Sequence, residues 1–153
     1  MNEQGLRYRE ANADDIAAMT VVRLAVRENR LSDPNWLTHQ MWLDGLAASG
    51  NSNSFVCEGE GRIVGFAIGR LRERDIWALF VDPASEGLGI GKQLLSMVSA
   101  WMFENGVDEI TLGTGVDTRA ETFYRMQGWQ VGGLSPKGER EYRLASPART
   151  ATA

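Results

Sequence analysis

One segment constrains the fold of this sequence more than any other, because an apolar strand, a glycine-rich loop and a helix follow one another without interruption. Ile76–Val81 is almost entirely apolar and predicts a strand at the centre of a sheet, which Asp82-Pro83 ends. An amphipathic helix is predicted over 89–105, with Gly106 as its C-terminal signal. A chain with this connection packs a helix against a sheet. The loop between them carries three alternating glycines, Gly87, Gly89 and Gly91.

The glycine loop predicts a binding site for phosphate groups. Glycines let the backbone approach a ligand closely, and the first turn of a helix offers unpaired N–H groups at the positive end of its dipole. Lys92 adds a positive charge beside that turn. A tight connection that binds nothing is the alternative interpretation, but such a connection does not require three alternating glycines.

Two common phosphate-binding motifs do not fit this loop. A P-loop, G-x-x-x-x-G-K-[ST], requires a glycine where Glu86 stands and a serine or threonine where Gln93 stands. The dinucleotide motif G-x-G-x-x-G fails as well, because Lys92 and Leu94 occupy the place of its third glycine in the two registers. The loop therefore favours another phosphate-bearing cofactor.

The rest of the chain predicts strands and helices in a mixed order. No linker divides the chain, so residues 1–144 predict one domain of the α/β (α+β) class, followed by a disordered tail over 145–153. The expected elements are a strand over 6–9, a helix that Asp14 or Asp15 caps and that runs to Asn29, a helix over 38–49, strands over 55–58 and 63–72 joined by the turn 59–62, a strand over 110–113, a helix over 119–127, and strands over 129–132 and 139–144.

Composition and charge exclude several classes of protein. The chain has 153 residues, of which 43% are hydrophobic and 24% charged, and this composition suits one globular core. Its net charge of −4 and the absence of a Lys or Arg run argue against nucleic acid and favour a cationic partner such as an amine. No segment has the pattern of a membrane span or a signal peptide, so we expect a cytoplasmic protein with no membrane partner.

The single cysteine and the single histidine carry little chemistry. One of each gives no internal disulfide and no recognisable metal site. Cys57 lies in a predicted strand, which favours a buried structural thiol over a nucleophile. His39 lies on the polar face of a predicted helix, which favours an exposed side chain.

Two motifs resemble the GCN5-related N-acetyltransferase (GNAT) family, and the resemblance covers nearly the whole chain. The first is similar to [QR]-x-x-G-x-[GA] at the start of a helix, and here it occupies Glu86–Gly91. The second is similar to N-x-x-A-x-x-F-Y-x-x-x-G-[FW], and here it occupies Asp117–Trp129. The resemblance implies one mixed, mostly antiparallel sheet of about six to seven strands, splayed between its central strands and flanked by about four helices.

The resemblance also implies acetyl-coenzyme A as the cofactor. Backbone N–H groups of the loop and the helix start would bind its pyrophosphate, and the end of the central strand would pair with the pantetheine arm. Asp117 matches the position whose side chain touches pantetheine, and Tyr124 matches the position of the general acid. The implied cofactor-binding residues are Leu79, Phe80, Val81, Glu86, Gly87, Leu88, Gly89, Ile90, Gly91, Lys92, Asp117 and Tyr124.

Two of these residues depart from the family pattern. Glu86 replaces Gln or Arg, so its carboxylate would repel a phosphate, and we expect it to cap the helix or to pair with an arginine or lysine. Asp117 replaces Asn and keeps the acceptor but loses the amide donor. Neither change removes the backbone N–H groups.

The acceptor pocket is expected from Val26–Trp42 and from the strand over 139–144. Arg23 and Arg27 lie four residues apart and could bind a carboxylate, which suggests an amino-acid-like acceptor. The general base stays open between Glu28, Glu73, Asp75, Asp82 and a water relay, and each carboxylate has a solvated or paired surface group as its alternative interpretation. The predicted substrate-binding residues are Arg27, Glu28, Asn29 and Trp77, with Trp36, His39 and Trp42 as further candidates.

These observations predict an N-acetyltransferase that transfers an acetyl group to a primary amine of a small molecule, either amino-acid-like or similar to a polyamine or an antibiotic. Tyr124 is the expected general acid. A protein N-terminus or lysine is an alternative acceptor, and a non-catalytic acyl-coenzyme A sensor is an alternative from another class. A homodimer is expected from the resemblance alone.

Overall fold

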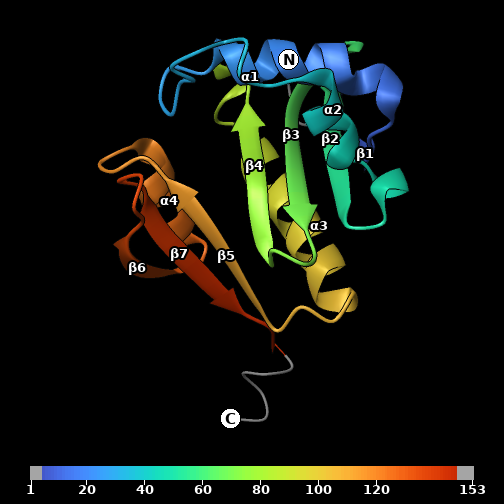
Figure 1. The fold of residues 1–153 in the computed structure, drawn as a ribbon. Helices are drawn as coiled ribbons and strands as arrows, with labels where there is room; N and C mark the ends of the chain where they lie inside the picture. Colours follow the sequence, from blue (N-terminus) through green and yellow to red (C-terminus); the bar gives the residue numbers. More distant parts are fainter. Residues whose placement is uncertain (1–4, 148–153) are drawn as a thin grey trace.

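The computed structural model describes residues 5–147. Within this range the chain forms one seven-stranded sheet with four α-helices around it (Figure 1), in agreement with the predicted fold class. The strands follow the order β1-β2-β3-β4-β5-β7-β6 across the sheet. The elements are β1 (Leu6–Glu10), α1 (Ile16–Ala25), α2 (His39–Asp44), β2 (Ser52–Gly59), β3 (Arg62–Arg70), β4 (Asp75–Val81), α3 (Ile90–Glu104), β5 (Glu109–Thr114), α4 (Arg119–Met126), β6 (Gln130–Leu134) and β7 (Arg140–Ala145).

The sheet divides between β4 and β5. Every other pair of neighbouring strands is antiparallel, whereas β4 and β5 are parallel and share one register position among the described residues, Asp75 opposite Thr111. Beyond this point the two strands diverge toward their carboxyl ends, as Figure 1 shows. The predicted central position of the strand over 76–81 is confirmed, and so is the predicted splay, because β4 lies fourth of seven strands and borders the opening.

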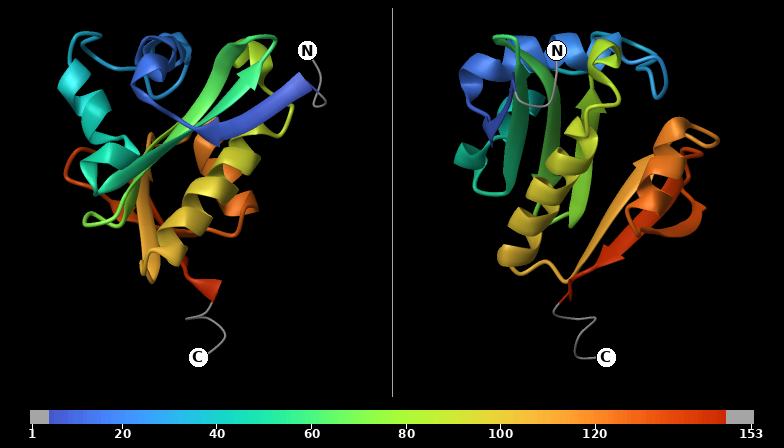
Figure 2. Two further views of the ribbon diagram at one scale, coloured as in Figure 1. Left: turned by 90° about the vertical axis from the view of Figure 1, so that its right-hand side faces the viewer. Right: turned by 180° about the vertical axis from the view of Figure 1, so that it is seen from behind.

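Helices cover both faces of the β1–β4 half (Figure 2), and each face has its own apolar core. On one face α3 buries Leu94, Leu95, Val98 and Met102, the four positions that its amphipathic pattern predicts. On the other face α1 and α2 bury a cluster that includes Met19, Trp42 and Phe66. Both cores pack on the same strands, which holds the amino end of α3 beside the carboxyl end of β4.

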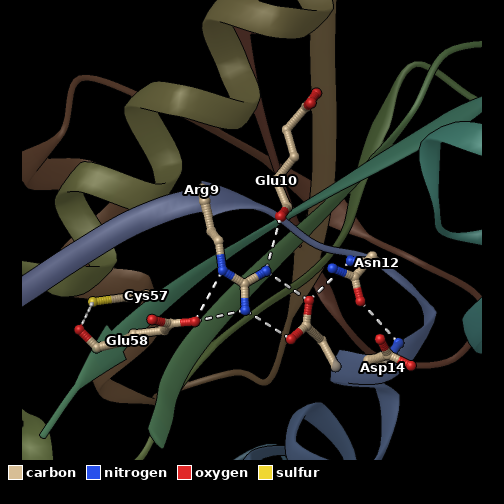
Figure 3. Close-up of polar contacts among 7 residues, drawn as sticks. Arg9, Glu10, Asn12, Asp14, Cys57 and Glu58 are labelled. Atoms are coloured by element: carbon tan, nitrogen blue, oxygen red, sulfur yellow. Dashed lines mark hydrogen bonds and ion pairs between the residues drawn. The ribbon is translucent and has the colours of Figure 1, made fainter. Parts of the chain in front are cut away.

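The start of the first helix differs from the predicted one. Asp15 directly precedes α1, as one of the two predicted caps, but its side chain makes no cap hydrogen bond to that helix. A capping box lies further upstream instead: the Asn12 side chain accepts from Asp14 N–H at 2.9 Å, while the Asp15 carboxylate accepts from Asn12 N–H at 2.8 Å. A short 3₁₀ turn, Ala13–Asp15, then leads into α1. Asp15 also binds Arg9, which contacts Glu58 on the neighbouring strand (Figure 3), so this ion-pair cluster ties the helix start to β1 and β2.

The first helix also ends earlier than predicted. Its last residue is Ala25, because Val26 is extended with ψ of 147°, and the predicted continuation to Asn29 is wrong. The predicted helix over 38–49 is likewise divided into α2 and a 3₁₀ turn, Ala47–Ser49. Residues 26–38 therefore form a loop that crosses the open end of the sheet.

The structure also bears on the predictions for Cys57, His39 and the C-terminal tail. Cys57 is fully buried and burial raises the pKa of its thiol, as expected for a structural cysteine, and His39 is exposed. Ala145, the first residue of the predicted tail, belongs to β7, and positions 148–153 lie outside the described residues. Over residues 5–147, none of the helices has both the length and the apolar character that a membrane crossing requires.

Candidate active site

A cleft of about 1190 Å³ occupies the splay between β4 and β5. Its walls come from β4, the amino end of α3, the inner face of α4, the loop over 26–38 and the tip before β7. This volume exceeds that of a typical small-ligand pocket, roughly 300–1,000 Å³. The cleft can therefore hold an extended cofactor together with a second, smaller molecule.

The amino end of α3 presents free backbone donors to this cleft. Gly89, the residue before the helix, has φ of 78°, and the first helical hydrogen bond runs from Gln93 N–H to its carbonyl at 3.1 Å. The N–H groups of the first turn precede that bond, and no side chain caps this end of the helix. Three unpaired donors at the positive end of a 15-residue helix make an anion site.

The three glycines contribute in two ways. Gly87 and Gly89 have φ of 83° and 78°, a region that other L-residues rarely adopt. Gly91 has no positive φ, but a Cβ there would lie 3.6 Å from the Phe123 ring and 3.8 Å from Val81, both of which line the cleft. The first two glycines therefore permit the turn, and the third keeps the cleft open beside the helix amides.

The carboxylate of Glu86 is neutralised by an arginine from α4. Arg119 Nη1 lies 2.8 Å from Glu86 Oε2 in an exposed ion pair, and this carboxylate raises the pKa of the Arg119 guanidinium. The prediction that Glu86 pairs with an arginine or lysine is confirmed. The pair leaves the helix amides and the exposed Lys92 as the positive features beside the glycine loop.

Tyr124 lies on the opposite wall, on the inner face of α4. It lines the cleft although only 6% of the residue is exposed, and its ring contacts those of Phe123, Trp129 and Tyr142 at centroid distances of 5.2, 5.8 and 5.8 Å. Burial raises the pKa of Tyr124 far above that of a free phenol. The raised pKa keeps the hydroxyl protonated near neutral pH, so that it can donate a hydrogen bond.

A buried carboxylate fixes the start of α4 and with it the position of Tyr124. Glu121 accepts from Tyr142 Oη at 2.7 Å and from Asp117 N–H at 2.6 Å, and these hydrogen bonds lower its pKa. Tyr124 follows three residues later, so its ring lies on the same side of the helix as Glu121. Asp117 itself has φ of 59° and does not line the cleft.

Most of the residues predicted for the cofactor meet around the cleft. Leu88 lies apart with Asp117, because its side chain packs against the core on the α3 face. The ten that line the cleft are Leu79, Phe80, Val81, Glu86, Gly87, Gly89, Ile90, Gly91, Lys92 and Tyr124.

The residues predicted for the acceptor also border the cleft. Arg27, Glu28, Asn29 and Trp77 all line it. Glu28 Oε1 also accepts from Arg119 N–H at 3.2 Å, and both polar atoms of the Asn29 side chain bind the end of β5 and the residue after it. Trp36 and Trp42 both line the cleft, Trp36 with 53% exposure and Trp42 as a buried ring that also packs in the core.

The four carboxylates considered as general base are engaged inside the protein. Asp75 lines the cleft but binds Arg70 through both oxygens, at 2.8 and 2.6 Å. Glu73 accepts from Asn51 Nδ2, and Asp82 accepts from Ala84 N–H and Arg62, and these hydrogen bonds lower the pKa of both carboxyls. Glu28 binds the start of α4 as described. A lowered pKa in Glu73 and Asp82 is the opposite of what a proton acceptor at neutral pH requires.

Two residues that line the cleft were not among the predicted cofactor-binding or substrate-binding residues. Phe123 faces Gly91 across the cleft and had no predicted role. Arg23 lies over the Phe80 ring, with its guanidinium carbon 4.1 Å from the ring centroid. The spacing of Arg23 and Arg27 suggested carboxylate binding. Only the fold shows that the Arg23 side chain, which comes from α1, lies against Phe80 of β4.

A splayed sheet, an uncapped helix end and a buried tyrosine in one cleft define a protein that holds an extended, anionic cofactor between two strands. Residues 19–129 match the model of the acetyltransferase (GNAT) family, so the chain belongs to this family and the predicted assignment is confirmed. As a member, the chain is an acyltransferase dependent on acetyl-coenzyme A.

Two proteins have sequences related to this chain. An N-acetyltransferase of Prochlorococcus marinus named ycf52-like is 33% identical over 82 residues, which cover 52% of this chain and 43% of that protein. The match thus spans less than half of that relative. The aminoglycoside N(6')-acetyltransferase type 1 of Stenotrophomonas maltophilia is 28% identical over 136 residues, which cover 80% of this chain and 84% of that protein.

Solved structures share the fold at low sequence identity. The phosphinothricin acetyltransferase of Sinorhizobium meliloti, solved with acetyl-coenzyme A, superposes with a TM-score of 0.78 at 20% identity, covering 97% of this chain and 92% of that one. The PaiA N-acetyltransferase of Thermoplasma acidophilum, solved with coenzyme A, has a TM-score of 0.76 at 14% identity, covering 92% and 99%. The predicted cofactor agrees with the ligands of these two neighbours.

Proposed function

We propose that this protein transfers the acetyl group of acetyl-coenzyme A to a primary amine of a small molecule, with the Tyr124 hydroxyl donating a hydrogen bond to the departing sulfur. One observation carries the proposal: the uncapped amino end of α3 and the buried Tyr124 face one cleft between two splayed strands. The curated relative that acts on an aminoglycoside supports a small-molecule acceptor.

The residues of the cleft fit the cofactor. The N–H groups of Ile90, Gly91 and Lys92 suit a pyrophosphate, because they are unpaired and no side chain competes for them. A Cβ on Gly91 would fill part of this cradle. The end of β4 borders the splay, where β5 no longer pairs with it, so Leu79–Val81 can bind an extended arm through their backbone.

The cofactor would supply an activated thioester. In the transfer, a C–N bond forms between the amine nitrogen and the acetyl carbon and the C–S bond breaks. The proton lost by nitrogen replaces the acetyl group on sulfur. An alkylamine has a pKa near ~10.4, so most of it carries an extra proton at pH 7 that must first leave. Asp75 and Glu28, the two base candidates that line the cleft, are engaged by Arg70 and Arg119, which supports proton removal through water.

Tyr124 assists the departure of sulfur by hydrogen bonding. A thiol has a pKa of about 8.5, well below that of a buried phenol, so complete proton transfer from Tyr124 to the sulfur is unfavourable. Donation of a hydrogen bond to the developing thiolate has no such cost, and it stabilises charge in a site sheltered from water. The proton that ends on sulfur then returns through the amine and water.

Release of free thiol from acetyl-coenzyme A across a panel of amines tests the proposal. We expect turnover with at least one small amine and formation of its N-acetyl product. Peptide N-termini and lysine peptides belong in the panel, because turnover with these alone would move the acceptor to proteins. Tight coenzyme A binding without turnover on any acceptor, and no effect of Tyr124→Phe, would instead favour a non-catalytic sensor.

A further inference from the structure

Arg23 is a half-buried cation without a counter-ion, and its Nη1 atom is fully buried. Among the described residues, three buried side-chain atoms lack a hydrogen-bond partner: Arg23 Nη1, Ser99 Oγ and Arg140 Nε. Ser99 is neutral, and Arg140 Nε lies 3.4 Å from a Glu121 carboxylate oxygen. Arg23 alone of the three carries a charge with no compensating group, and burial lowers its pKa with no carboxylate acting against it. An uncompensated buried charge is costly, so it requires an explanation.

Three of the carboxylates that line the cleft bind other groups. Asp75 is held by Arg70, Glu86 by Arg119, and Glu28 by the Arg119 N–H group. Within residues 5–147, no carboxylate lies within 4.0 Å of the Arg23 guanidinium. Arg70 and Arg119 also line the cleft, but the charge of each is already compensated by an ion pair.

An aromatic platform holds Arg23 in place. Its guanidinium stacks on Phe80, whose ring packs on Phe66 at 5.8 Å, and Phe66 packs on Trp42 at 5.4 Å. The stacking fixes the plane of the guanidinium, so the fork is oriented before any ligand arrives. Because Arg23 lines the cleft, its remaining N–H groups are the ones that a ligand there would reach.

The surroundings of Arg23 indicate which part of the cleft this is. Phe80 stands on β4 one residue before its end, and the loop over 26–38 covers the same region with Val26, Trp36 and Leu37. The uncapped helix end that suits the pyrophosphate lies past the end of β4, beyond Pro83–Ser85. Arg23 therefore belongs to the acceptor end, in a pocket with apolar and aromatic walls.

The geometry points to Arg23 as the residue that binds a carboxylate of the acceptor, so that the acetylated amine belongs to an amino-acid-like molecule with an apolar side chain. This inference rests on the proposed acetyl transfer and specifies its acceptor. A guanidinium fork binds a carboxylate through two parallel hydrogen bonds, which would supply the missing counter-charge. A polyamine or an aminoglycoside would instead bring a second positive charge beside an unpaired cation.

Matched acceptors test the inference. The wild-type protein is assayed by thiol release with leucine and phenylalanine, with their carboxamides and with their decarboxylated amines. We expect kcat/KM for the acids to exceed that for the neutral analogues at least tenfold. Arg23→Gln should abolish this preference, lowering kcat/KM for the acids about 10- to 100-fold, as expected for a charge-assisted hydrogen bond, and leaving the analogues unchanged. Arg7→Gln makes the same change on exposed edge strand β1 and should leave every value unchanged.

Two readouts do not depend on turnover. The thermal midpoint in the presence of N-acetylleucine should rise more than with N-acetylleucinamide for the wild type, and equally little with both for Arg23→Gln. Arg23→Met should not lower the thermal midpoint of the free protein, because it replaces an uncompensated cation with an apolar chain of similar length. A clear fall in that midpoint would assign Arg23 a structural role and overturn the inference.

The outcomes for the two proposals are distinguishable. Equal turnover of acids, carboxamides and decarboxylated amines, unchanged in Arg23→Gln, overturns the carboxylate assignment and leaves acetyl transfer intact. Absence of thiol release with every amine, with N-acetylleucine bound through Arg23 as predicted, overturns acetyl transfer instead. Preference for polyamines over all amino acids also contradicts the assignment.

Discussion

The side chain of Asn29 joins the loop after α1 to the backbone of Gly115, across the open end of the splayed sheet. Asn29 Oδ1 accepts the Gly115 N–H at 2.7 Å, and Nδ2 donates to Thr114 Oγ1 at 3.0 Å. The loop after α1 is thereby attached to the end of β5, on the far side of the cleft. A Cβ on Gly115 would lie 2.5 Å from Asn29 Oδ1, so the glycine at this position permits the contact.

Loss of this link should loosen the acceptor pocket. Asn29→Ala removes two hydrogen bonds and is expected to lower the free energy of unfolding by about 1–2 kcal/mol. It should also raise KM for the amine more than KM for acetyl-coenzyme A, because the loop covers the acceptor end. Denaturant unfolding and steady-state kinetics measure the two effects. Asn35→Ala, at an exposed position of the same loop, is the control, and an equal effect of both variants would contradict this role.

A substitution at Gly91 should affect the stability of α3 and its affinity for coenzyme A in different directions. Gly91→Ala should keep or raise the thermal midpoint, because Ala is favoured over Gly within a helix by about 0.8–1.0 kcal/mol and the new Cβ makes ordinary contacts. Its affinity for coenzyme A, measured by calorimetry, should fall at least tenfold, since the Cβ points into the cleft. Gly133→Ala, at an open position in β6, should change neither quantity. Unchanged affinity in Gly91→Ala would remove the helix end from the cofactor site.

The Glu86–Arg119 pair predicts an unusual gain of affinity. Glu86→Gln removes a negative charge beside the helix end and releases Arg119 toward the phosphates, so coenzyme A should bind several-fold more tightly, with a steeper dependence on salt. Glu104→Gln makes the same change at the exposed far end of α3 and should have no effect. Weaker binding in Glu86→Gln would show that the carboxylate itself takes part in the site.

The ion pair of Asp15 should make the free energy of unfolding depend on pH in the acid range. Hydrogen bonds from Arg9 lower the pKa of Asp15 below its usual value of 3.8, so its contribution is complete above that pH and is lost as the pH falls through the folded pKa. At pH 7 Asp15→Asn should cost about 2 kcal/mol of unfolding free energy. The difference from wild type should shrink below pH 4, whereas Asp14→Asn, an exposed neighbour, should match wild type throughout. A cost independent of pH would contradict the ion-pair account.

The strand, loop and helix from β4 to α3 could be predicted because their signals are local. The apolar run, the proline, the glycines and the helical period each act within a few residues, and the observed bounds differ from the predicted ones by one residue. The end of α1 could not be predicted in this way. Helical propensity continues past Ala25, but Glu28 and Asn29 bind the start of α4 and the end of β5, and these distant contacts decide the backbone.

The chemistry of the site shows the same division. The helix end and Tyr124 follow from motif positions, whereas the pairing of Asp75 with Arg70 and the isolation of Arg23 depend on which side chains the fold brings together. A sequence displays charges but not their partners. Arg23 and Asp75 therefore change their interpretation once the strands and helices are in place, the first from one of two spaced arginines to an unpaired cation, the second from a base candidate to a paired carboxylate.

The measurement that tests the account most directly compares wild type with Tyr124→Phe in acetyl transfer to the best amine of the panel. The variant keeps the ring and its aromatic contacts and loses only the hydroxyl. We predict a fall in kcat of about 100-fold or more, typical for loss of a positioned hydrogen-bond donor to developing charge, with an unchanged thermal midpoint and unchanged affinity for coenzyme A. An unchanged kcat in the presence of normal turnover would contradict the role of Tyr124 and the mechanism built on it.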